Sequence, residues 1–175
     1  MLQLPHHGRY DYSCIEERPD YSWPGGKRLA FYVALNIEHF AFGTGIGMDP
    51  TNRGGPQTTR NWAWRDYGNR VGIWRLFRML DDLGLPATIL LNSTVCEHYP
   101  QIVARIKARG DDVVGHGRTN AEASRGLWET DEARLIADCN ATIAAHFGKP
   151  PAGWMGPAAA ESGVTPDLLK EAGYT

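Results

Sequence analysis

Short apolar runs that alternate with helical segments constrain the fold of this chain more than any other feature of its sequence. The runs are rich in residues that favour buried strands, and the segments between them repeat apolar residues every three or four positions, as an amphipathic helix does. Strand and helix in alternation are typical of a parallel sheet. The sequence therefore predicts an α/β fold with a parallel sheet. Its strands are expected over 28–36, 87–91, 113–116 and 152–155.

The ends of the predicted helices carry the residues that local backbone geometry favours there. Glycine adopts the left-handed backbone that closes a helix, whereas threonine and proline favour the first positions. Both signals occur between the predicted strands, which supports the alternation. Helices are expected over 69–83, 100–109, 130–147 and 165–172, with Thr130 and Thr165 as N-caps and with Gly84, Gly110, Gly148 and Gly173 as stops.

The length of 175 residues favours one domain. Residues 1–26 show no periodicity and are expected to form an N-terminal arm, with the domain over 27–175. Residues 40–66 are rich in glycine and are expected to be a long loop, either functional or mobile. The chain stops where another strand would begin, so we expect the C-terminal part of the domain to be missing. Met1 does not open a secretory signal, which makes the cytoplasm the expected compartment.

The charge balance limits the classes of partner. Basic and acidic residues leave a formal net charge of −2, so electrostatic binding to nucleic acid or to an anionic membrane is not expected. No apolar stretch approaches the ~20 residues of a membrane span. Cys14, Cys96 and Cys139 form no CxxC pair and are expected to be ordinary thiols, not a zinc knuckle or a disulfide framework. Self-association into a homo-oligomer stays open.

Unusual clusters end the first, third and fourth predicted strands. The first strand ends in Asn36-Ile37-Glu38-His39, the third in His116-Gly117-Arg118-Thr119-Asn120, and the fourth in Gly153-Trp154-Met155-Gly156-Pro157. Because the C-terminal ends of parallel strands meet at one edge of a sheet, we expect the three clusters to line one pocket. A carboxylate, two imidazoles and an amide could coordinate a divalent metal that activates water, or could act without metal as general base and hydrogen-bond donors. Each cluster alone is equally compatible with a structural hydrogen bond.

Aromatic and basic residues near these strand ends are candidates for substrate contact. Trp62 and Trp64 lie in the expected loop and could form a wall of the pocket, whereas Trp74 falls on the apolar face of a helix and is expected in the core. Arginine binds carboxylates and carbonyls through its planar group, although an arginine is more often solvated or ion-paired. The arginines considered are Arg65, Arg70 and Arg118.

Several of these motifs together resemble the polysaccharide deacetylase family. Leu35-Asn36-Ile37-Glu38-His39 stands where that family has a Thr-Phe-Asp-Asp-type strand end, and 116–120 stands where it has a His-x-x-x-His motif. The segments 23–30, 66–76 and 84–88 are similar to the allantoinase-related branch, and the resemblance covers about residues 20–175. It implies a distorted, seven-stranded parallel (β/α) barrel, of which this chain holds only the N-terminal strands.

The resemblance also implies an activity and a set of site residues. The family hydrolyses carbon–nitrogen bonds other than peptide bonds, either removing N-acetyl groups from amino sugars in carbohydrate metabolism or opening cyclic ureides. Glu38 falls on the general base, and His39, His116 and Asn120 fall on metal-ligand positions, with zinc the foremost ion and metal-independent action left open. Catalysis is assigned to Glu38 and His116. Substrate contacts are assigned to Trp64, Arg118, Trp154 and Met155.

The departures from the family pattern support an alternative. Asn120 stands in place of a second histidine, and Met155 stands where deacetylases carry an arginine that orients the base. A catalytically inactive domain, which binds a ligand without turning it over, is therefore the second hypothesis. The substrates expected for the first hypothesis are a small amide or ureide, or an N-acetylated sugar.

Overall fold

The computed structural model describes residues 7–43 and 57–175, and its internal contacts divide the chain between Phe31 and Tyr32. In the part before this division, the described residues form two short 3₁₀ turns, η1 (Ile15–Glu17) and η2 (Pro24–Gly26). An antiparallel bridge between Trp23 and Lys27 closes the second turn. The expected boundary between residues 26 and 27 stays a prediction.

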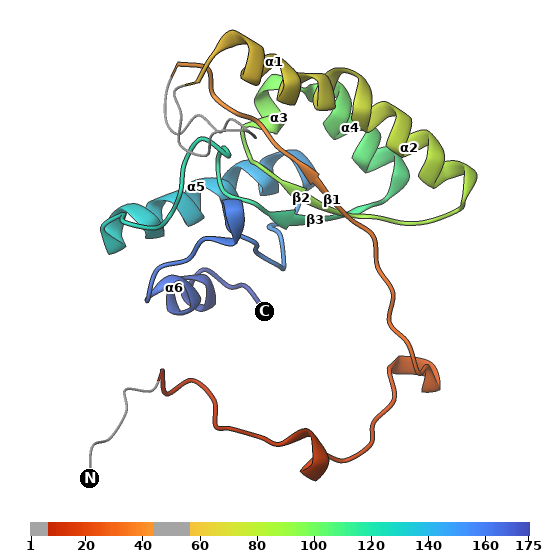
Figure 1. Ribbon diagram of the computed structural model, residues 1–175, viewed down its shortest axis with the longest axis vertical. Coiled ribbons are helices and arrows are strands. Elements are labelled where there is room, and N and C mark those ends of the chain that lie inside the picture. Colours follow the sequence, from red (N-terminus) through yellow and green to blue (C-terminus); the bar gives the residue numbers. More distant parts are fainter. Residues whose placement is uncertain (1–6, 44–56) are drawn as a thin grey trace. The chain divides into compact units, whose positions relative to one another are not determined.

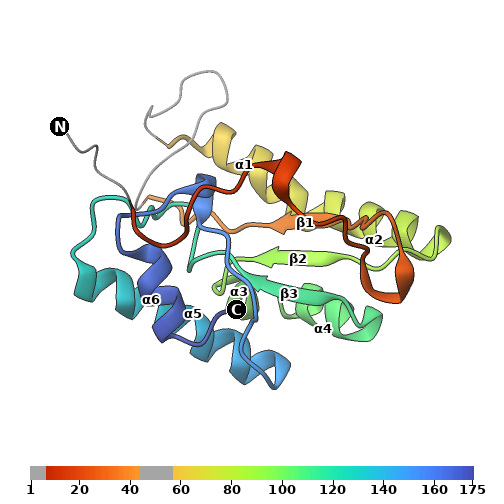
Figure 2. The same ribbon diagram turned by 90° about the horizontal axis from the view of Figure 1, so that it is seen from below.

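The second part contains a three-stranded parallel sheet, which confirms the predicted α/β class. Its strands β1 (Ala34–Ile37), β2 (Thr88–Leu91) and β3 (Asp112–Gly115) lie in the order β1-β2-β3, and Figure 2 shows their arrows pointing the same way. The helical segments are α1 (Thr59–Tyr67), η3 (Gly68–Gly72), α2 (Ile73–Asp82), α3 (Val95–His98), α4 (Pro100–Arg109), α5 (Glu129–Phe147), η4 (Pro157–Ala159) and α6 (Thr165–Glu171).

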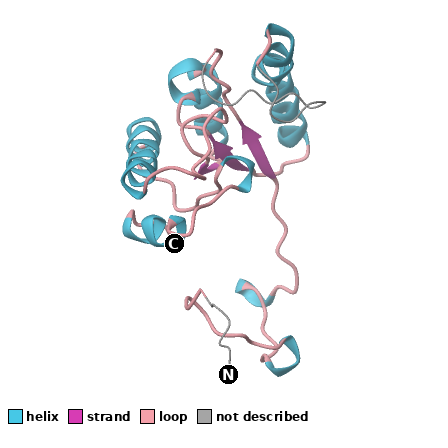
Figure 3. Cartoon of the chain, turned by 60° about the vertical axis from the view of Figure 1, so that its left-hand side comes forward, coloured by secondary structure: helices cyan, strands magenta, loops and turns pink. Residues whose placement is uncertain are grey.

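The main hydrophobic core lies between this sheet and the helices that connect its strands. Ile37, Ile89 and Leu91 point from the sheet toward α2 and α4, where they meet Phe77 and Ile106, all nearly inaccessible to solvent. Figures 1 and 3 show α2 and α4 together beside the sheet. Amphipathic helices between parallel strands must cover the sheet in this way to bury their apolar faces. None of the helices within 7–43 and 57–175 is long and apolar enough to cross a membrane.

Two predicted strands differ from the structure. β1 begins at Ala34 rather than at residue 28, and its burial alternates, with Ile37 buried and Asn36 exposed, so it is not the fully buried strand that its apolar sequence predicts. The residues before it are not paired as a strand: Val33 accepts the N–H of Thr88, the first residue of β2, at 2.8 Å, and Pro86 has no N–H with which to continue the pairing. The fourth predicted strand is reduced to one parallel bridge, between Gly115 and Trp154.

The helices also correct the sequence analysis in places. The expected loop 40–66 is helical from Thr59, because the side chains of Thr58 and Asn61 form a capping box that starts α1; residues 44–56 of that loop lie outside the described part. α5 has Trp128 rather than Thr130 at its N-cap, and α6 has Val164 rather than Thr165. The glycine stops are confirmed at α4 and α5, where Gly110 (φ 72°) and Gly148 (φ 82°) are left-handed.

The register of the strands aligns the residues that follow them. Ile37 pairs with Leu91, and Leu91 pairs with Gly115. The next residue on each strand, respectively Glu38, Asn92 and His116, therefore leaves the sheet at the same level. Parallel pairing thus brings three polar side chains to one edge of the sheet.

Candidate active site

Glu38 and His116 form the centre of the site. Nε2 of His116 lies 3.4 Å from Oε1 of Glu38, and the side chain of His116 is 2% exposed. Nε2 has no hydrogen-bond partner among the described residues, because the contact with Glu38 is long for a hydrogen bond. The two strand ends therefore come together, as the sequence predicts. One buried nitrogen of His116 faces the carboxylate of Glu38.

The other ring nitrogen of His116 fixes how its protons are arranged. Nδ1 lies 2.5 Å from the main-chain oxygen of Met155, and a carbonyl oxygen can only accept. Nδ1 therefore carries the proton of that hydrogen bond, and Nε2 is the ring nitrogen that faces Glu38. A proton on Nε2 would lie directly beside the carboxylate of Glu38.

The surroundings of Glu38 favour its charged form. Burial raises the pKa of this carboxyl, but contacts with His116, Asn36 and Asn120 outweigh it and hold the pKa below the usual 4.5. The contact with Asn36 is a hydrogen bond of 3.1 Å from its side-chain amide to Oε1. Glu38 is therefore a carboxylate at neutral pH and is able to accept a proton.

His39 follows Glu38 directly but its ring contacts a different set of residues. The ring stacks on His98 with centroids 4.3 Å apart, and Nδ1 lies 3.3 Å from the hydroxyl of Tyr99, which in turn donates to Asp66. Burial lowers the pKa of His39, His98 lowers it further, and Asp66 opposes the change. Successive residues of an extended chain point to opposite sides, which separates this ring from Glu38.

The expected metal-ligand set does not fit a metal ion as the structure places it. The ring of His39 is engaged with His98 and Tyr99, and the side-chain oxygen of Asn120 accepts a hydrogen bond of 3.2 Å from Asn92. Of the assigned set, His116 directs an unbonded Nε2 toward Glu38, whereas the ring of His39 contacts other residues. Within 7–43 and 57–175, no group of three or more His, Cys, Asp or Glu residues could hold an ion. Two converging donors fall short of the three that catalytic zinc sites use.

Two of the residues expected to contact substrate, Trp64 and Arg118, contact side chains other than Glu38 and His116. Trp64 is half-exposed on α1, with Arg60 over its ring. Arg118 pairs with Glu122 (2.6 Å) and Asp138 (3.0 Å). These contacts do not support the expected roles of Trp64 and Arg118 in substrate binding.

The segment after the fourth predicted strand contributes its main chain rather than its side chains. Trp154 packs edge-on against Tyr174 and lies so close over Gly115 that a Cβ there would be 2.8 Å from the indole. Met155 touches the centre through its carbonyl oxygen, which receives Nδ1 of His116, while its side chain is exposed. The hydrogen bond from this segment to His116 is thus made by the main chain and does not depend on the side chain of residue 155.

A cavity of about 210 Å³ lies beside Glu38, between β1 and the continuous helical segment α1–η3–α2. Of the three candidate arginines, Arg65 lines this cavity, with its guanidinium 4.3 Å from the centroid of Phe40. Arg70 pairs with Asp66 instead. A larger cavity, of about 380 Å³, lies at the opposite ends of the strands beside Asp112; we assign the site to the smaller one because it contains the carboxylate.

Two asparagines of the site escaped the sequence analysis. Asn92 is fully buried after β2 and bonds to the loops that follow β1 and β3. Asn69 lies in the π-helical turn η3, and its amide donates to the main-chain oxygen of Glu38 at 2.7 Å. A signal for Asn92 was present in the sequence, because Asn92 is a polar residue directly after a buried strand, as Glu38 and His116 are. The segment 66–76 was singled out only for its resemblance, without a role for Asn69.

The buried thiols take no part in this chemistry. Burial raises the pKa of Cys96 to about 11 and that of Cys139 to about 12. Both are therefore protonated at neutral pH, as expected for packed cysteines.

Comparisons with known proteins give the context of this geometry. A search of curated proteins found no match. Among solved structures, the allantoinase PuuE has a TM-score of 0.74 and 20% identity, over 94% of this chain and 60% of that one. A probable polysaccharide deacetylase from Pseudomonas aeruginosa PAO1 has a TM-score of 0.72 and 21% identity, over 87% of this chain and 54% of that one. The chain thus spans about 60% of the length of the allantoinase.

A third structure shows that the fold alone does not decide activity. The pseudoenzyme of carbohydrate esterase family 4 from Bacillus anthracis has a TM-score of 0.54 and 18% identity, over 61% of this chain and 37% of that one. The three likenesses identify the parallel strands and their helices as part of a deacetylase-type (β/α) barrel. The profile of the polysaccharide deacetylase family matches residues 64–175, more than half of the sequence. The chain therefore belongs to the polysaccharide deacetylase family.

Proposed function

We propose that this chain carries the catalytic centre of a hydrolase that cleaves a carbon–nitrogen bond of an amide or ureide, with Glu38 as the general base. The observation that carries the proposal is the pairing of the Glu38 carboxylate with the buried Nε2 of His116, 3.4 Å away, at the C-terminal edge of a parallel sheet. Membership of the polysaccharide deacetylase family supports this reaction class.

The two side chains have complementary tasks. Glu38, charged at neutral pH, removes a proton from a water molecule as that water attacks the carbonyl carbon. Nε2 of His116 faces the same place, and with a proton bound it can stabilise the negative charge on the carbonyl oxygen or protonate the leaving nitrogen. The bond from Nδ1 to Met155 holds the ring in place during both steps. His39 and Asn120 are not needed as metal ligands in this scheme.

The cavity favours a small substrate. A volume of about 210 Å³ is below the ~300–1,000 Å³ of typical ligand sites and suits a cyclic ureide better than a polymer. We therefore place a small ureide, such as the allantoin implied by the name of the allantoinase neighbour, ahead of an N-acetylated sugar. Arg65 is the cavity residue best placed to hold a carbonyl of either substrate.

Replacement of the base tests the proposal. Glu38→Gln keeps the size and most of the hydrogen bonding of the side chain but cannot accept the proton. We expect kcat on allantoin, or on a chitin oligosaccharide, to fall about 10²- to 10⁴-fold, the usual contribution of a general base. Steady-state kinetics on the purified protein measure the change.

Glu97→Gln is the matched control, because Glu97 is exposed on α3 and its replacement should leave kcat unchanged. A Glu38→Gln protein that retains the parental rate would show that the base is wrongly assigned. Binding of these compounds without turnover, equal in both proteins, would favour the alternative of an inactive domain.

A further inference from the structure

The side chain of Asn92 connects the two loops that carry the proposed catalytic residues. Its oxygen accepts the main-chain N–H of His39 at 2.9 Å, in the loop after β1. Its nitrogen donates to the main-chain oxygen of His116 and, at 3.2 Å, to the side-chain oxygen of Asn120, both in the loop after β3. Asn92 itself is 0% exposed at the end of β2, the strand between the other two.

The contact with Asn120 extends to the carboxylate of Glu38. Because the oxygen of Asn120 accepts from Asn92, its NH₂ group is left to donate, and contact with this side chain is among the interactions that lower the pKa of Glu38. The orientation of one buried amide therefore determines the orientation of a second one, which touches the base.

The main chain next to the base is held from other directions as well. The oxygen of His39 accepts from the hydroxyl of Thr119 at 2.7 Å and from the N–H of Asn120 at 2.9 Å. The oxygen of Glu38 accepts from Asn69. The two peptide groups that follow Glu38 thus bond to three different segments, and the side chain of Asn92 bonds to the loops of both Glu38 and His116.

No other side chain of similar size could make these bonds. Asparagine offers an acceptor and two donors at one site, whereas aspartate offers only acceptors and leucine offers neither. An aspartate at position 92 would face two acceptors, the oxygens of His116 and Asn120. A buried network of this kind is stable only when every member is satisfied, and it then holds its members in one arrangement.

We propose that Asn92 is the positioning residue of the active site. By bonding to the loops of both Glu38 and His116, it fixes the position of one side chain relative to the other. It touches neither substrate nor the reacting atoms, and it acts on the reaction through the backbone of His39 and His116 and through the amide of Asn120. This inference rests on the proposed function, in which Glu38 is the base.

Kinetics separate positioning from simple stabilisation. In Asn92→Ala we expect kcat to fall about 10- to 100-fold with KM within about threefold, since a displacement of ~1 Å in a catalytic group can cost 10²-fold. Thr119→Val keeps the shape of the side chain but removes its bond to the oxygen of His39 and its bond from the N–H of Ala121, and it should lower kcat about 3- to 10-fold in the same manner. A folded Asn92→Ala protein with parental kcat would overturn the proposal, and Thr119→Val decides if Asn92→Ala does not fold.

Asn140→Ala is the matched control. Asn140 also uses its side chain to join distant segments, donating to the oxygen of Ala172 at 3.4 Å and accepting from the hydroxyl of Tyr174. We expect this variant to lose stability without a change in kcat. Loss of kcat in proportion to loss of thermal stability in both asparagine variants would show that the role of Asn92 is structural alone.

Asn92→Asp supplies a second readout, the pH dependence of kcat/KM. The added negative charge beside Asn120 and His116 should raise the pKa of Glu38 and move the acidic limb of the kcat/KM profile to higher pH. A limb at the parental position would contradict the inferred connection between residue 92 and the base.

Hydrogen exchange tests the inference without any substrate. The amide of His39 should exchange faster in Asn92→Ala than in the parental protein, and at the parental rate in Asn140→Ala. This result would support the positioning role of Asn92 even if no ureide or amide is turned over. In that case the proposed function would fail, but the positioning role would stand. An unchanged exchange rate at His39 would overturn the positioning role of Asn92, whatever the activity of the variants.

Discussion

At the scale of single residues, the pH dependence of the reaction should report the contacts of Glu38. The amide of Asn36 donates to Oε1 at 3.1 Å and stabilises the charged form. Asn36→Ala removes this donor, so the pKa of Glu38 should rise. Because only the charged form accepts a proton, the acidic limb of kcat/KM should move to higher pH, which a pH–rate profile measures.

A neighbour on the same sheet provides the control for this prediction. Thr88 lies on β2 and pairs with Ala34 in the register, two residues before Asn36. Thr88→Ala should leave the acidic limb where it is in the parental protein. If Asn36→Ala also leaves it unchanged, the limb belongs to a group other than Glu38.

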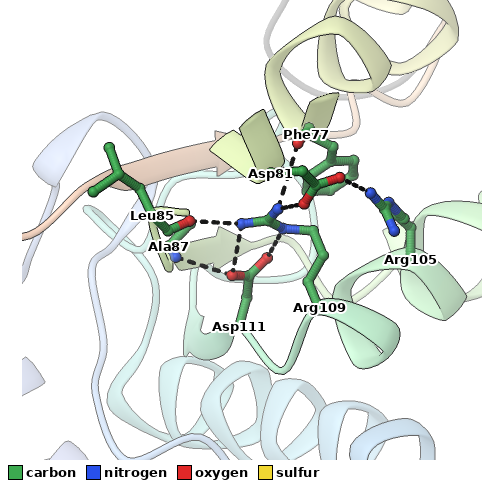
Figure 4. A network of polar contacts seen from close by, with 7 residues as sticks. All are labelled: Phe77, Asp81, Leu85, Ala87, Arg105, Arg109 and Asp111. Carbon is green, nitrogen blue, oxygen red and sulfur yellow. Dashed lines mark hydrogen bonds and ion pairs between the residues drawn. The ribbon is translucent and has the colours of Figure 1, made fainter. Parts of the chain in front are cut away.

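At the scale of the elements, a buried ion network joins α4 to the start of β2 and β3 (Figure 4). The guanidinium of Arg109, 6% exposed, pairs with Asp111 (2.6 Å) and Asp81 and donates to the oxygen of Leu85 at 2.9 Å. Asp111 in turn accepts the N–H of Ala87 at 2.9 Å. These residues lie at the N-terminal ends of the strands, away from Glu38, and set the register in which β2 enters the sheet.

Removal of the central arginine should therefore destabilise the fold without a specific effect on the site. Arg109→Ala leaves Asp111 buried and unpaired, and we expect a loss of about 3–5 kcal/mol in the free energy of unfolding. Urea denaturation measures this loss.

Arg105→Ala is the control on the same helix. Arg105 is about one-third exposed and pairs with Asp81, so its removal should cost less than about 1 kcal/mol. Equal losses in the two variants would mean that burial does not set the strength of the network.

At the scale of the whole chain, the division between Phe31 and Tyr32 should be visible in proteolysis. Lys27 and Arg28 lie in an exposed segment before this division, and Leu29 is 78% exposed. We expect brief trypsin digestion to cut after one of these two residues before it cuts within 57–175. Mass spectrometry identifies the first products, and an early cut inside α2 or α4 would contradict the expected order.

Local sequence signals sufficed for most of the secondary structure of this chain. Pro100 and Gly110 mark the two ends of α4 because their backbone preferences act within a single turn. α1 was missed because the glycine-rich stretch before it suggested a loop and because its capping box uses Asn61 in place of the usual glutamate or glutamine. The fourth strand was overestimated, since a short apolar run does not show how many partners it will find.

For the site, the sequence predicted only the edge of the sheet at which it lies. The rule for parallel strands placed Glu38 and His116 together, and the structure does bring them to 3.4 Å. The same rule gave no warning that His39 turns to His98 and Tyr99, or that Asn92 connects the loops.

The sequence by itself thus determined the order of strands and helices and the end of the sheet where polar side chains gather, since these follow from apolar periodicity and local backbone preference. Which of those side chains meet was decided only by the tertiary structure. Two neighbours such as Glu38 and His39 point to opposite sides of the chain. Their partners, among them His116 and Tyr99, come from segments whose register and packing no local pattern encodes.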